Sequence, residues 1–256
     1  MIRLEVDQGV ARLTIDRPQV LNALDPQAES DLEAALSEVE QDRSVFVAVL
    51  TGAGDRSFCA GADMRSPGRS GIDYWAHLAP GGMGGVAAST RFTVPLLARV
   101  NGFALGGGFE MVLGCDIAVA AEGATFGLTE PQVGRLALGG GVVRLPRATT
   151  HKWAMELLLT GRRITAHEAA RFGLVNEVVP LGDLDAAVER WVERLRACAP
   201  LTLRAVKQMV NETAHLSLAD AMSHRSAAMI AALESEDASE GVAAFRERRP
   251  PHWRGC

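Results

Sequence analysis

Two glutamates are the first candidates for acid and base chemistry, because each follows a glycine-bearing turn in apolar surroundings. Glu110 comes directly after GGGF at 106–109, and Glu130 follows FGLT at 126–129. Burial among apolar side chains raises the pKa of a carboxyl group, and two such groups can share the acid and base steps at one reacting bond. Each glutamate taken singly could instead form an ordinary ion pair.

The three glycines at 106–108 predict a turn from a strand into a helix. Glycine permits the positive φ angles of such a turn, and the amide N–H groups at a helix start point outward with the positive end of the helix dipole behind them. These amides can bind an oxygen atom that gains negative charge during a reaction. The same glycines could serve only the close packing of a buried helix, so the cluster alone establishes no site.

The glycine-bearing segments 57–64, 101–110 and 126–134 each follow or close a predicted strand. Residues 2–6 and 10–15 alternate apolar with polar residues around a short turn, which predicts a β-hairpin. Residues 45–50, 96–100 and 117–120 are continuous apolar runs, typical of strands that are covered on both faces. We therefore expect an α/β sheet with crossover connections, whose strand ends carry the site.

Helix signals lie on both sides of these strands. Asp25 and Pro26 predict a helix start, and Leu32, Leu36 and Val39 recur at helical spacing. After about residue 182 the pattern predicts successive helices over 184–196, 201–210, 216–233 and 236–246. Residues 65–85 are rich in glycine, proline and serine, and we interpret them as a mobile loop beside the site or a plain surface insertion.

Composition excludes several classes of protein. Hydrophobic residues make up 48% and charged residues 22% of the 256 residues, which fits a folded domain rather than a disordered or fibrous chain. The 31 acidic residues outnumber the 26 basic ones, so nucleic acid is not an expected partner. No run of transmembrane length and no signal-peptide pattern is present, and we expect no membrane partner and a cytoplasmic location.

Other catalytic patterns find less support. The glycine clusters match neither the dinucleotide fingerprint nor the phosphate loop. No GxSxG elbow appears, and the four cysteines are widely spaced, with no histidine that can be assigned as a partner for Cys59. A serine or cysteine hydrolase remains open only in principle, and no metal site is expected.

Six segments together resemble the enoyl-CoA hydratase/isomerase, or crotonase, superfamily. The resemblance runs in order from about residue 10 to residue 253 and covers the following motifs: RPQVLNAL at 17–24, SFCAGADM at 57–64, GFALGGGFE at 102–110, FGLTEPQVG at 126–134, TGRRITAHEAARFGLVNEVVP at 160–180 and EDASEGVAAFRERRPPHW at 236–253. The proline that the family commonly has near position 137 is absent, which leaves the shape of the acyl pocket open.

The resemblance implies a set of site residues. The amides of Ala62 and Gly107 would form an oxyanion hole for a thioester oxygen, with Glu110 as the base that activates water and Glu130 as the proton donor to C2. Coenzyme A contacts are implied at eight further positions: Gln19, Val20, Leu21, Ala60, Asp63, Met64, Lys207 and Phe245. Lys207 and Phe245 would reach the coenzyme A of an adjacent subunit.

The resemblance also implies an architecture: a crotonase-like ββα spiral core with the acyl-CoA site over residues 1–195, and a helical C-terminal trimerisation segment over 196–256. We expect a homotrimer or a hexamer made of two trimers. The implied activity is the reversible hydration of a 2-enoyl-CoA in lipid metabolism, with coenzyme A as part of the substrate and no separate cofactor. A double-bond isomerase, an acyl-CoA hydrolase and a non-enzymatic RNA-binding scaffold are the alternatives.

Overall fold

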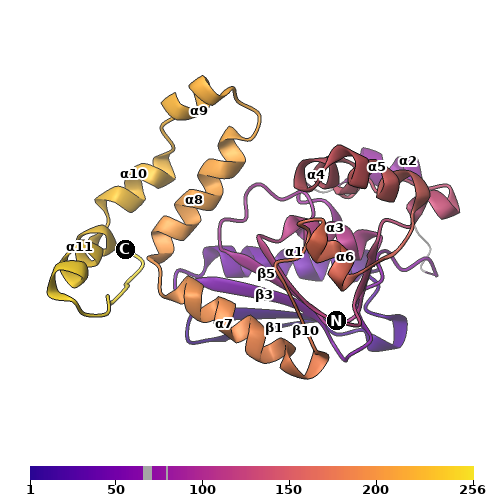
Figure 1. Cartoon of the computed structure of the whole chain (residues 1–256), viewed down its shortest axis with the longest axis horizontal. Coiled ribbons are helices and arrows are strands. Elements are labelled where there is room, and N and C mark those ends of the chain that lie inside the picture. The colour runs from indigo at the N-terminus through magenta and orange to yellow at the C-terminus, as the bar shows by residue number, and fades with distance from the viewer. Residues whose placement is uncertain (66–70, 79) are drawn as a thin grey trace.

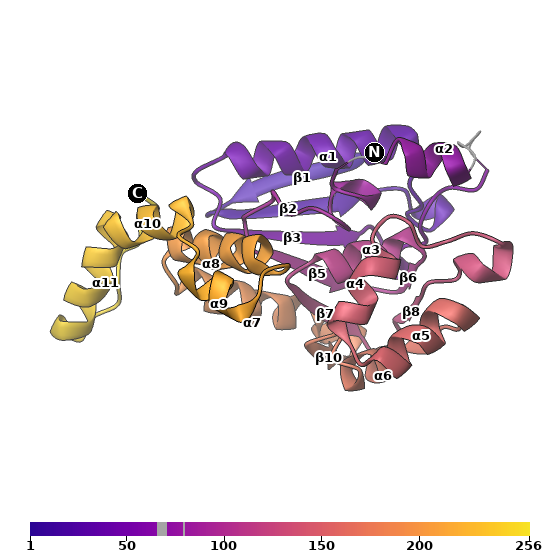
Figure 2. The same ribbon diagram turned by 90° about the horizontal axis from the view of Figure 1, so that it is seen from above.

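A six-stranded sheet forms the centre of the fold. The structure, a computed structural model, describes residues 1–65, 71–78 and 80–256. The strand order is β1-β2-β3-β5-β7-β10, and Figure 2 shows the strands side by side in this order. Their bounds are β1 Ile2–Asp7, β2 Val10–Ile15, β3 Val47–Gly52, β5 Leu96–Val100, β7 Ile117–Ala121 and β10 Glu177–Val179.

The expected hairpin is confirmed, and so are the three buried strands. β1 and β2 pair antiparallel through a two-residue turn in which Gln8 and Gly9 have φ of 47° and 79°. Two successive positive φ angles match the right-handed twist of the flanking strands. The other pairs are all parallel, as the crossover connections require. The α/β class of the fold therefore agrees with the expectation.

A second, smaller sheet alternates with the first along the chain. Its order is β4-β6-β8-β9, with bounds β4 Ser57–Cys59, β6 Phe103–Leu105, β8 Thr125–Gly127 and β9 Ile164–Thr165. β4, β6 and β8 are mutually parallel, so their carboxyl ends lie at one edge. The three glycine-bearing segments leave the sheet at this edge, and the small sheet thereby brings them together.

Helices cover both faces of the large sheet. α1, Pro26–Gln41, begins at Asp25, whose side chain accepts a hydrogen bond from the Ala28 N–H, and it buries Leu32, Leu36 and Val39 as expected. α7, Leu184–Arg196, packs against the opposite face. The remaining helices of the core are α2 Gly71–Ala76, α3 Gly107–Gly114, α4 Gly141–Ala148, α5 His151–Thr160 and α6 Ala166–Arg171.

The C-terminal helices form an arm that extends away from the sheet (Figure 1). Its members are α8 Pro200–Thr213, α9 Leu218–Ser223, α10 Ala227–Glu234 and α11 Glu236–Glu247. The single helix expected over 216–233 was wrong, because the chain turns at His224 to Ser226, where His224 lies 2.9 Å from the Glu212 carboxylate and Ser226 is buried. The helical C-terminal segment itself is confirmed.

The chain end folds back on the arm. Asp237 is 2% exposed, and its carboxylate accepts hydrogen bonds from the N–H groups of Arg254 and Gly255 at 2.7 and 2.9 Å. Trp253 donates from its indole N–H to the Ala197 carbonyl. These contacts hold the tail of the chain against the start of α11.

The segment interpreted as a loop contains regular structure. Its described part forms α2 and a short 3-10 helix, Met83–Gly85, whereas residues 66–70 and 79 lie outside the described residues. Glycine and proline content therefore gave a wrong expectation for residues 71–76. No helix of the described residues is long and apolar enough to cross a membrane.

Candidate active site

The glycine turn at 106–108 begins helix α3, as expected. Gly106 has φ +52° and precedes the first helical residue, Gly107. A side chain at Gly108 would lie 1.9 Å from the Cys59 carbonyl oxygen, so the turn also packs closely on strand β4. The close-packing interpretation of the glycines is therefore confirmed, and this packing on β4 brings the start of α3 beside the 59–64 segment.

Glu110 lies in the first turn of α3 and is buried. It is 3% exposed, and its Oε1 accepts a hydrogen bond from the Gly141 N–H at 2.8 Å. Burial raises the pKa of Glu110 to about 7, and the negative charge of Glu130 adds to this rise, although the Gly141 N–H opposes it. The ion-pair alternative fails for this residue, because no salt bridge within the described residues includes Glu110.

Glu130 comes to the same turn from the end of strand β8. It begins the 3-10 helix Glu130–Val133, and its Oε1 lies 3.1 Å from where a Gly106 side chain would begin. Its Oε2 is buried and has no hydrogen-bond partner among the described residues. Burial also raises the pKa of Glu130. The two predicted carboxylates therefore lie close together, and each favours its protonated form more than a surface glutamate does.

The amides of Ala62 and Gly107 also come together. Ala62 pairs with Leu24 in a parallel bridge, in which the Gly61 carbonyl and the Asp63 N–H face Leu24, each at 2.8 Å. Because successive amides of an extended chain point to opposite sides, the Ala62 N–H points away from Leu24. A side chain at Gly61 would lie 3.0 Å from the Gly107 nitrogen, which places the 61–62 peptide beside the start of α3.

Neither of these two N–H groups donates a hydrogen bond within the part of the chain that the structure describes. Ala62 is exposed, whereas Gly107 is buried at the start of α3. Unpaired amides of this kind, held by a helix start and a strand bridge, can bind a developing oxyanion without rearranging. The arrangement fits the chemistry that the sequence predicts for these two positions.

The predicted coenzyme A contacts at 19–21 and 60–64 are neighbours in the structure. The Ala60 N–H donates to the Leu21 carbonyl at 3.1 Å. Leu21 and Asn22 have left-handed φ angles of 55° and 57°, and the Asn22 side chain holds this turn by donating to the Ser57 carbonyl at 2.6 Å. The two segments thus form one rim next to the amides of Ala62 and Gly107, with Gln19 and Met64 at the ends of the predicted set.

Comparison with known proteins agrees with this geometry. The family profile described as enoyl-CoA hydratase/isomerase matches residues 5–256. The chain is 38% identical over 256 residues to (E)-benzylidenesuccinyl-CoA hydratase of Thauera aromatica, covering 100% of this chain and 99% of the relative. It is 34% identical over 258 residues to carnitinyl-CoA dehydratase of Proteus mirabilis, covering 99% and 98%. The chain belongs to the enoyl-CoA hydratase/isomerase family.

Solved structures of this family share the fold. The enoyl-CoA hydratase from Mycobacterium tuberculosis H37Rv superposes with a TM-score of 0.89 at 34% identity, covering 100% of this chain and 99% of that one. The enoyl-CoA hydratase from Bacillus anthracis superposes with a TM-score of 0.90 at 30% identity, covering 100% and 99%. The crotonase-like spiral expected from the sequence is therefore confirmed.

Two predicted residues of this family member lie apart from the others. Lys207, on α8, donates to the Asp116 carboxylate at 2.7 Å and to the Val94 carbonyl at 2.9 Å, so its ammonium group is engaged within the chain. Phe245, on α11, is 85% exposed in the arm. Neither joins the site of its own chain, and their expected contact with the coenzyme A of an adjacent subunit stays a prediction.

Two residues near the site were missed from the sequence. Met83 is buried against Gly107, where a side chain would lie 2.6 Å from its Cγ. Tyr74, the one tyrosine of the chain, places its hydroxyl 3.6 Å from the Met83 Sδ. Burial raises the pKa of Tyr74, with further contributions from glutamates that include Glu110 and Glu130. The only signal available was the single tyrosine of the chain, in a segment interpreted as a mobile loop beside the site or a plain surface insertion.

Cys59 does not support hydrolase chemistry. The thiol is fully buried on β4, and burial raises the pKa of Cys59 to about 12. A nucleophilic cysteine needs its thiolate form, which this setting disfavours. Its Sγ instead accepts a hydrogen bond from the Gly61 N–H at 3.3 Å, so the thiol has a structural contact beside the oxyanion segment.

Proposed function

We propose that this chain catalyses the reversible addition of water to a 2-enoyl-CoA, giving a 3-hydroxyacyl-CoA. Membership in the family supports hydro-lyase chemistry on a coenzyme A thioester, and the relatives are named both as a hydratase and as a dehydratase. The observation that carries the finer proposal is the pair of carboxyl groups with raised pKa beside Gly106 and Gly107. A hydration needs such a pair, since one group removes a proton from water and another supplies a proton to carbon.

The thioester oxygen is the first atom that the site must stabilise. Attack of water at C3 moves the electrons of the double bond toward the thioester, and negative charge builds up on its oxygen. In the proposed mechanism the N–H groups of Ala62 and Gly107 donate to this oxygen, and they need no reorganisation because both are fixed by the backbone. The positive end of the α3 dipole adds to the stabilisation.

The two glutamates then divide the proton transfers. Ionised Glu110 takes a proton from the attacking water, and the oxygen of that water bonds to C3. Protonated Glu130 gives its proton to C2 as the enolate collapses, so water is added with no net loss of protons. Dehydration follows the same steps in reverse. The raised pKa of both groups supports a pair that holds one proton, because two neighbouring carboxyls favour the state in which only one is ionised, and the resemblance assigns the donor and the base.

An assay with three thioesters tests the proposal. Purified protein is incubated with crotonyl-CoA, with a 3-enoyl-CoA and with a saturated acyl-CoA. The products are separated by chromatography and identified by mass and by the ultraviolet absorbance of the conjugated thioester. We expect crotonyl-CoA to gain the mass of one water. Migration of the double bond in the 3-enoyl-CoA without hydration would favour the isomerase, and free coenzyme A from the saturated thioester would favour the hydrolase.

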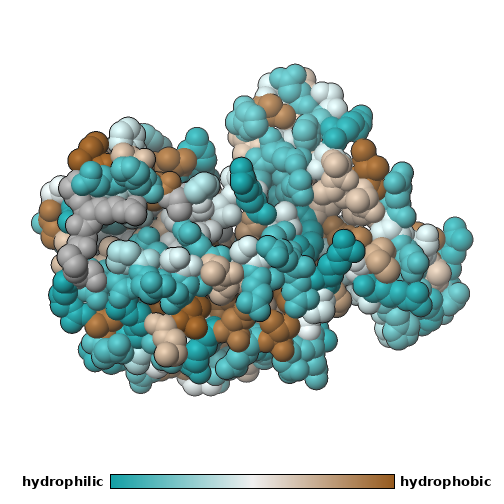
Figure 3. All heavy atoms as spheres, turned by 180° about the vertical axis from the view of Figure 1, so that it is seen from behind, coloured by the Kyte–Doolittle hydropathy of each residue, from teal (hydrophilic) through white to brown (hydrophobic). Residues whose placement is uncertain are grey.

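We further propose that the active assembly is a trimer or a hexamer. Figure 3 shows hydrophobic side chains at the surface of the arm. The arm exposes large apolar side chains at the following positions: Val206, Val210, Leu218, Met222, Leu233, Val242 and Phe245. Exposed apolar groups of this number are typical of a surface covered by another subunit. Light scattering at micromolar concentration checks the assembly, and a monomer would contradict it.

A further inference from the structure

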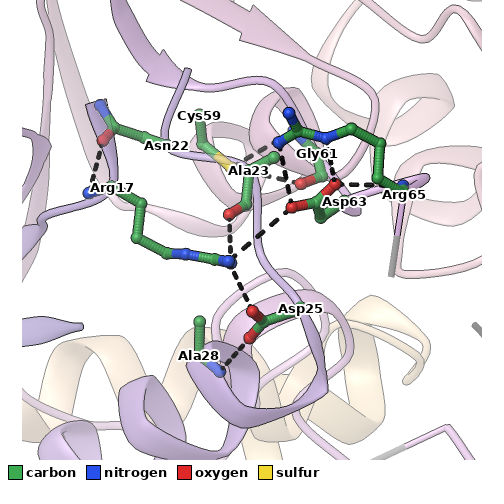
Figure 4. Close-up of polar contacts among 9 residues, drawn as sticks. All are labelled: Arg17, Asn22, Ala23, Asp25, Ala28, Cys59, Gly61, Asp63 and Arg65. Carbon is green, nitrogen blue, oxygen red and sulfur yellow. Dashed lines mark hydrogen bonds and ion pairs between the residues drawn. The ribbon is translucent and has the colours of Figure 1, made fainter. Parts of the chain in front are cut away.

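Arg17 lies behind the rim that carries the Ala62 amide, and Figure 4 shows its guanidinium between two acidic side chains. It donates to the Ala23 carbonyl at 2.7 Å and forms a close ion pair with Asp25, the residue that begins α1. The same guanidinium lies 3.7 Å from the carboxylate of Asp63, the neighbour of Ala62. One side chain therefore joins the start of α1 to the oxyanion segment.

These contacts are well protected from water. The side chains of Arg17 and Asp63 are only 14% and 9% exposed. The main-chain N–H of Arg17 also donates to the Asn22 side chain at 3.0 Å, which fixes the backbone on the other side of the turn. Charge-assisted hydrogen bonds in such settings hold geometry more firmly than surface ion pairs do.

The segment that carries the Ala62 amide needs such support. Residues 61–63 pair with the neighbouring chain segment through an isolated bridge to Leu24 rather than a strand, and Gly61 adopts φ +89°, a conformation that favours glycine. Ala62 has a methyl side chain and is exposed, so its own packing does little to orient the peptide. The peptide is fixed through its neighbours: the main chain of Gly61 and Asp63 bonds to Leu24, the Gly61 N–H donates to the Cys59 sulfur, and the Asp63 carboxylate pairs with Arg17 and Arg65.

We propose that Arg17 is a positioning residue of the oxyanion hole. By binding Asp25, the Ala23 carbonyl and Asp63 together, the guanidinium sets the direction of the 62–63 peptides and so aims the Ala62 N–H at the thioester oxygen. This inference rests on the proposed function. A lysine has one compact charge and lacks the planar fork that donates to Ala23 and Asp25 while it lies beside Asp63, so it replaces Arg17 poorly.

Acetoacetyl-CoA provides a spectroscopic measurement of the oxyanion hole that a change in protein stability alone does not affect. Its enolate absorbs in the ultraviolet, and an oxyanion hole raises the fraction of bound ligand in that form. For Arg17→Gln we expect the enolate band per bound ligand and kcat with crotonyl-CoA to fall together by about tenfold, because one of two oxyanion donors is misaligned. KM is expected to change by less than about twofold, and Arg17→Lys is expected to recover only part of the loss.

Two further variants keep the test decisive. Asp63→Asn removes the contact beside Ala62 but retains the Arg17 pair with Asp25, so we expect a weaker enolate band even where the thermal midpoint is close to that of the wild type. Arg12→Gln is the matched control, since it removes an exposed ion pair with Glu189 on the far side of the sheet and should leave the band unchanged. An unchanged band in both Arg17→Gln and Asp63→Asn would overturn the inference.

The two proposals fail in different ways. If the wild-type protein neither hydrates crotonyl-CoA nor binds acetoacetyl-CoA, the proposed function is wrong. If the wild type hydrates crotonyl-CoA and binds acetoacetyl-CoA, and the Arg17 variants show the same enolate band as the wild type, only the positioning role is wrong. A loss of kcat in Arg17→Gln with a wild-type enolate band would likewise contradict it, because the oxyanion amides would then be correctly placed.

Discussion

Glu110 and Glu130 lie beside the same glycine turn, but they are held in different ways. Glu110 belongs to the first turn of α3, is almost fully buried and has its Oε1 fixed by the Gly141 N–H. Glu130 is half buried at the start of a 3-10 helix, and its buried Oε2 has no partner among the described residues. One carboxyl is fixed in orientation by a backbone N–H, whereas the other has a buried oxygen that no described residue holds. The difference suits the proposed roles, with Glu110 as a base held in one orientation and Glu130 as the proton donor to C2.

Removing either carboxylate should have the largest effect. We expect Glu110→Gln and Glu130→Gln each to lower turnover of crotonyl-CoA by about 100-fold or more, because each variant loses one proton transfer. Thioester binding, measured by calorimetry, should persist in both. Glu189→Gln, which changes an exposed carboxylate on α7, is the control and should retain full activity. Full activity in both site variants would refute the assignment of roles.

The free energy of unfolding should depend on pH differently for the two carboxylates. The folded state binds the Glu110 proton up to a pH of about 7, whereas the unfolded chain releases it near 4.5, so the free energy of unfolding falls as pH rises between these values. Glu110→Gln lacks this penalty, and at pH of about 8 we expect it to be more stable than the wild type by up to about 3 kcal/mol. The gain should shrink near pH of about 5.

Urea unfolding at both pH values measures this effect. Glu130→Gln should show a smaller pH-dependent gain, since Glu130 is more exposed than Glu110. Equal gains at the two pH values would mean that the ionised form of Glu110 carries no burial penalty.

The pH profile of the reaction offers an intermediate effect. The pair must keep one proton for the transfer to C2, so kcat/KM should fall by about tenfold per unit as pH rises above about 7, where the second carboxyl ionises. In Glu130→Gln only Glu110 titrates, and the charge that helps to raise its pKa is gone, so the residual activity should rise with pH through a midpoint below about 7. Residual activity that instead falls as pH rises would reverse the proposed roles.

Tyr74→Phe should have the smallest effect. The hydroxyl of Tyr74 contacts the sulfur of Met83, a weak acceptor, so its loss should change kcat/KM for crotonyl-CoA by no more than about threefold. Steady-state kinetics with a set of enoyl-CoA thioesters checks this. A loss of about tenfold or more for thioesters with an oxygen in the acyl group would show that the phenol binds substrate.

The large sheet and the main helices could be predicted because their signals are local. A few neighbouring residues are enough to recognise each of them: the Asp25-Pro26 start of α1, the hairpin turn and the three apolar runs. The small sheet could not be predicted in this way, since its strands are two or three residues long and show no period. It is nevertheless the element that gathers the site at one edge.

The site was predictable in its residue types but not in its electrostatics. Glycine turns followed by glutamates pointed to 110 and 130, and the resemblance supplied the amides at 62 and 107. The partner of Glu110, the Gly141 N–H, lies 31 residues further along the chain, and no spacing rule indicates it. The contact between Arg17 and Asp63 was also missed. These residues are 46 positions apart in the sequence, and no periodic pattern connects them.

The tail that folds back on α11 has a consequence for how this protein can be altered. Asp237 is charged and nearly inaccessible, and the main chain of Arg254 and Gly255 satisfies both of its oxygens. Deleting the last three residues would leave the Asp237 carboxylate buried without hydrogen-bond partners. The fold would lose more stability than it would from the loss of an exposed tail. Affinity tags and fusion partners therefore belong at the amino terminus, where Met1 is 73% exposed.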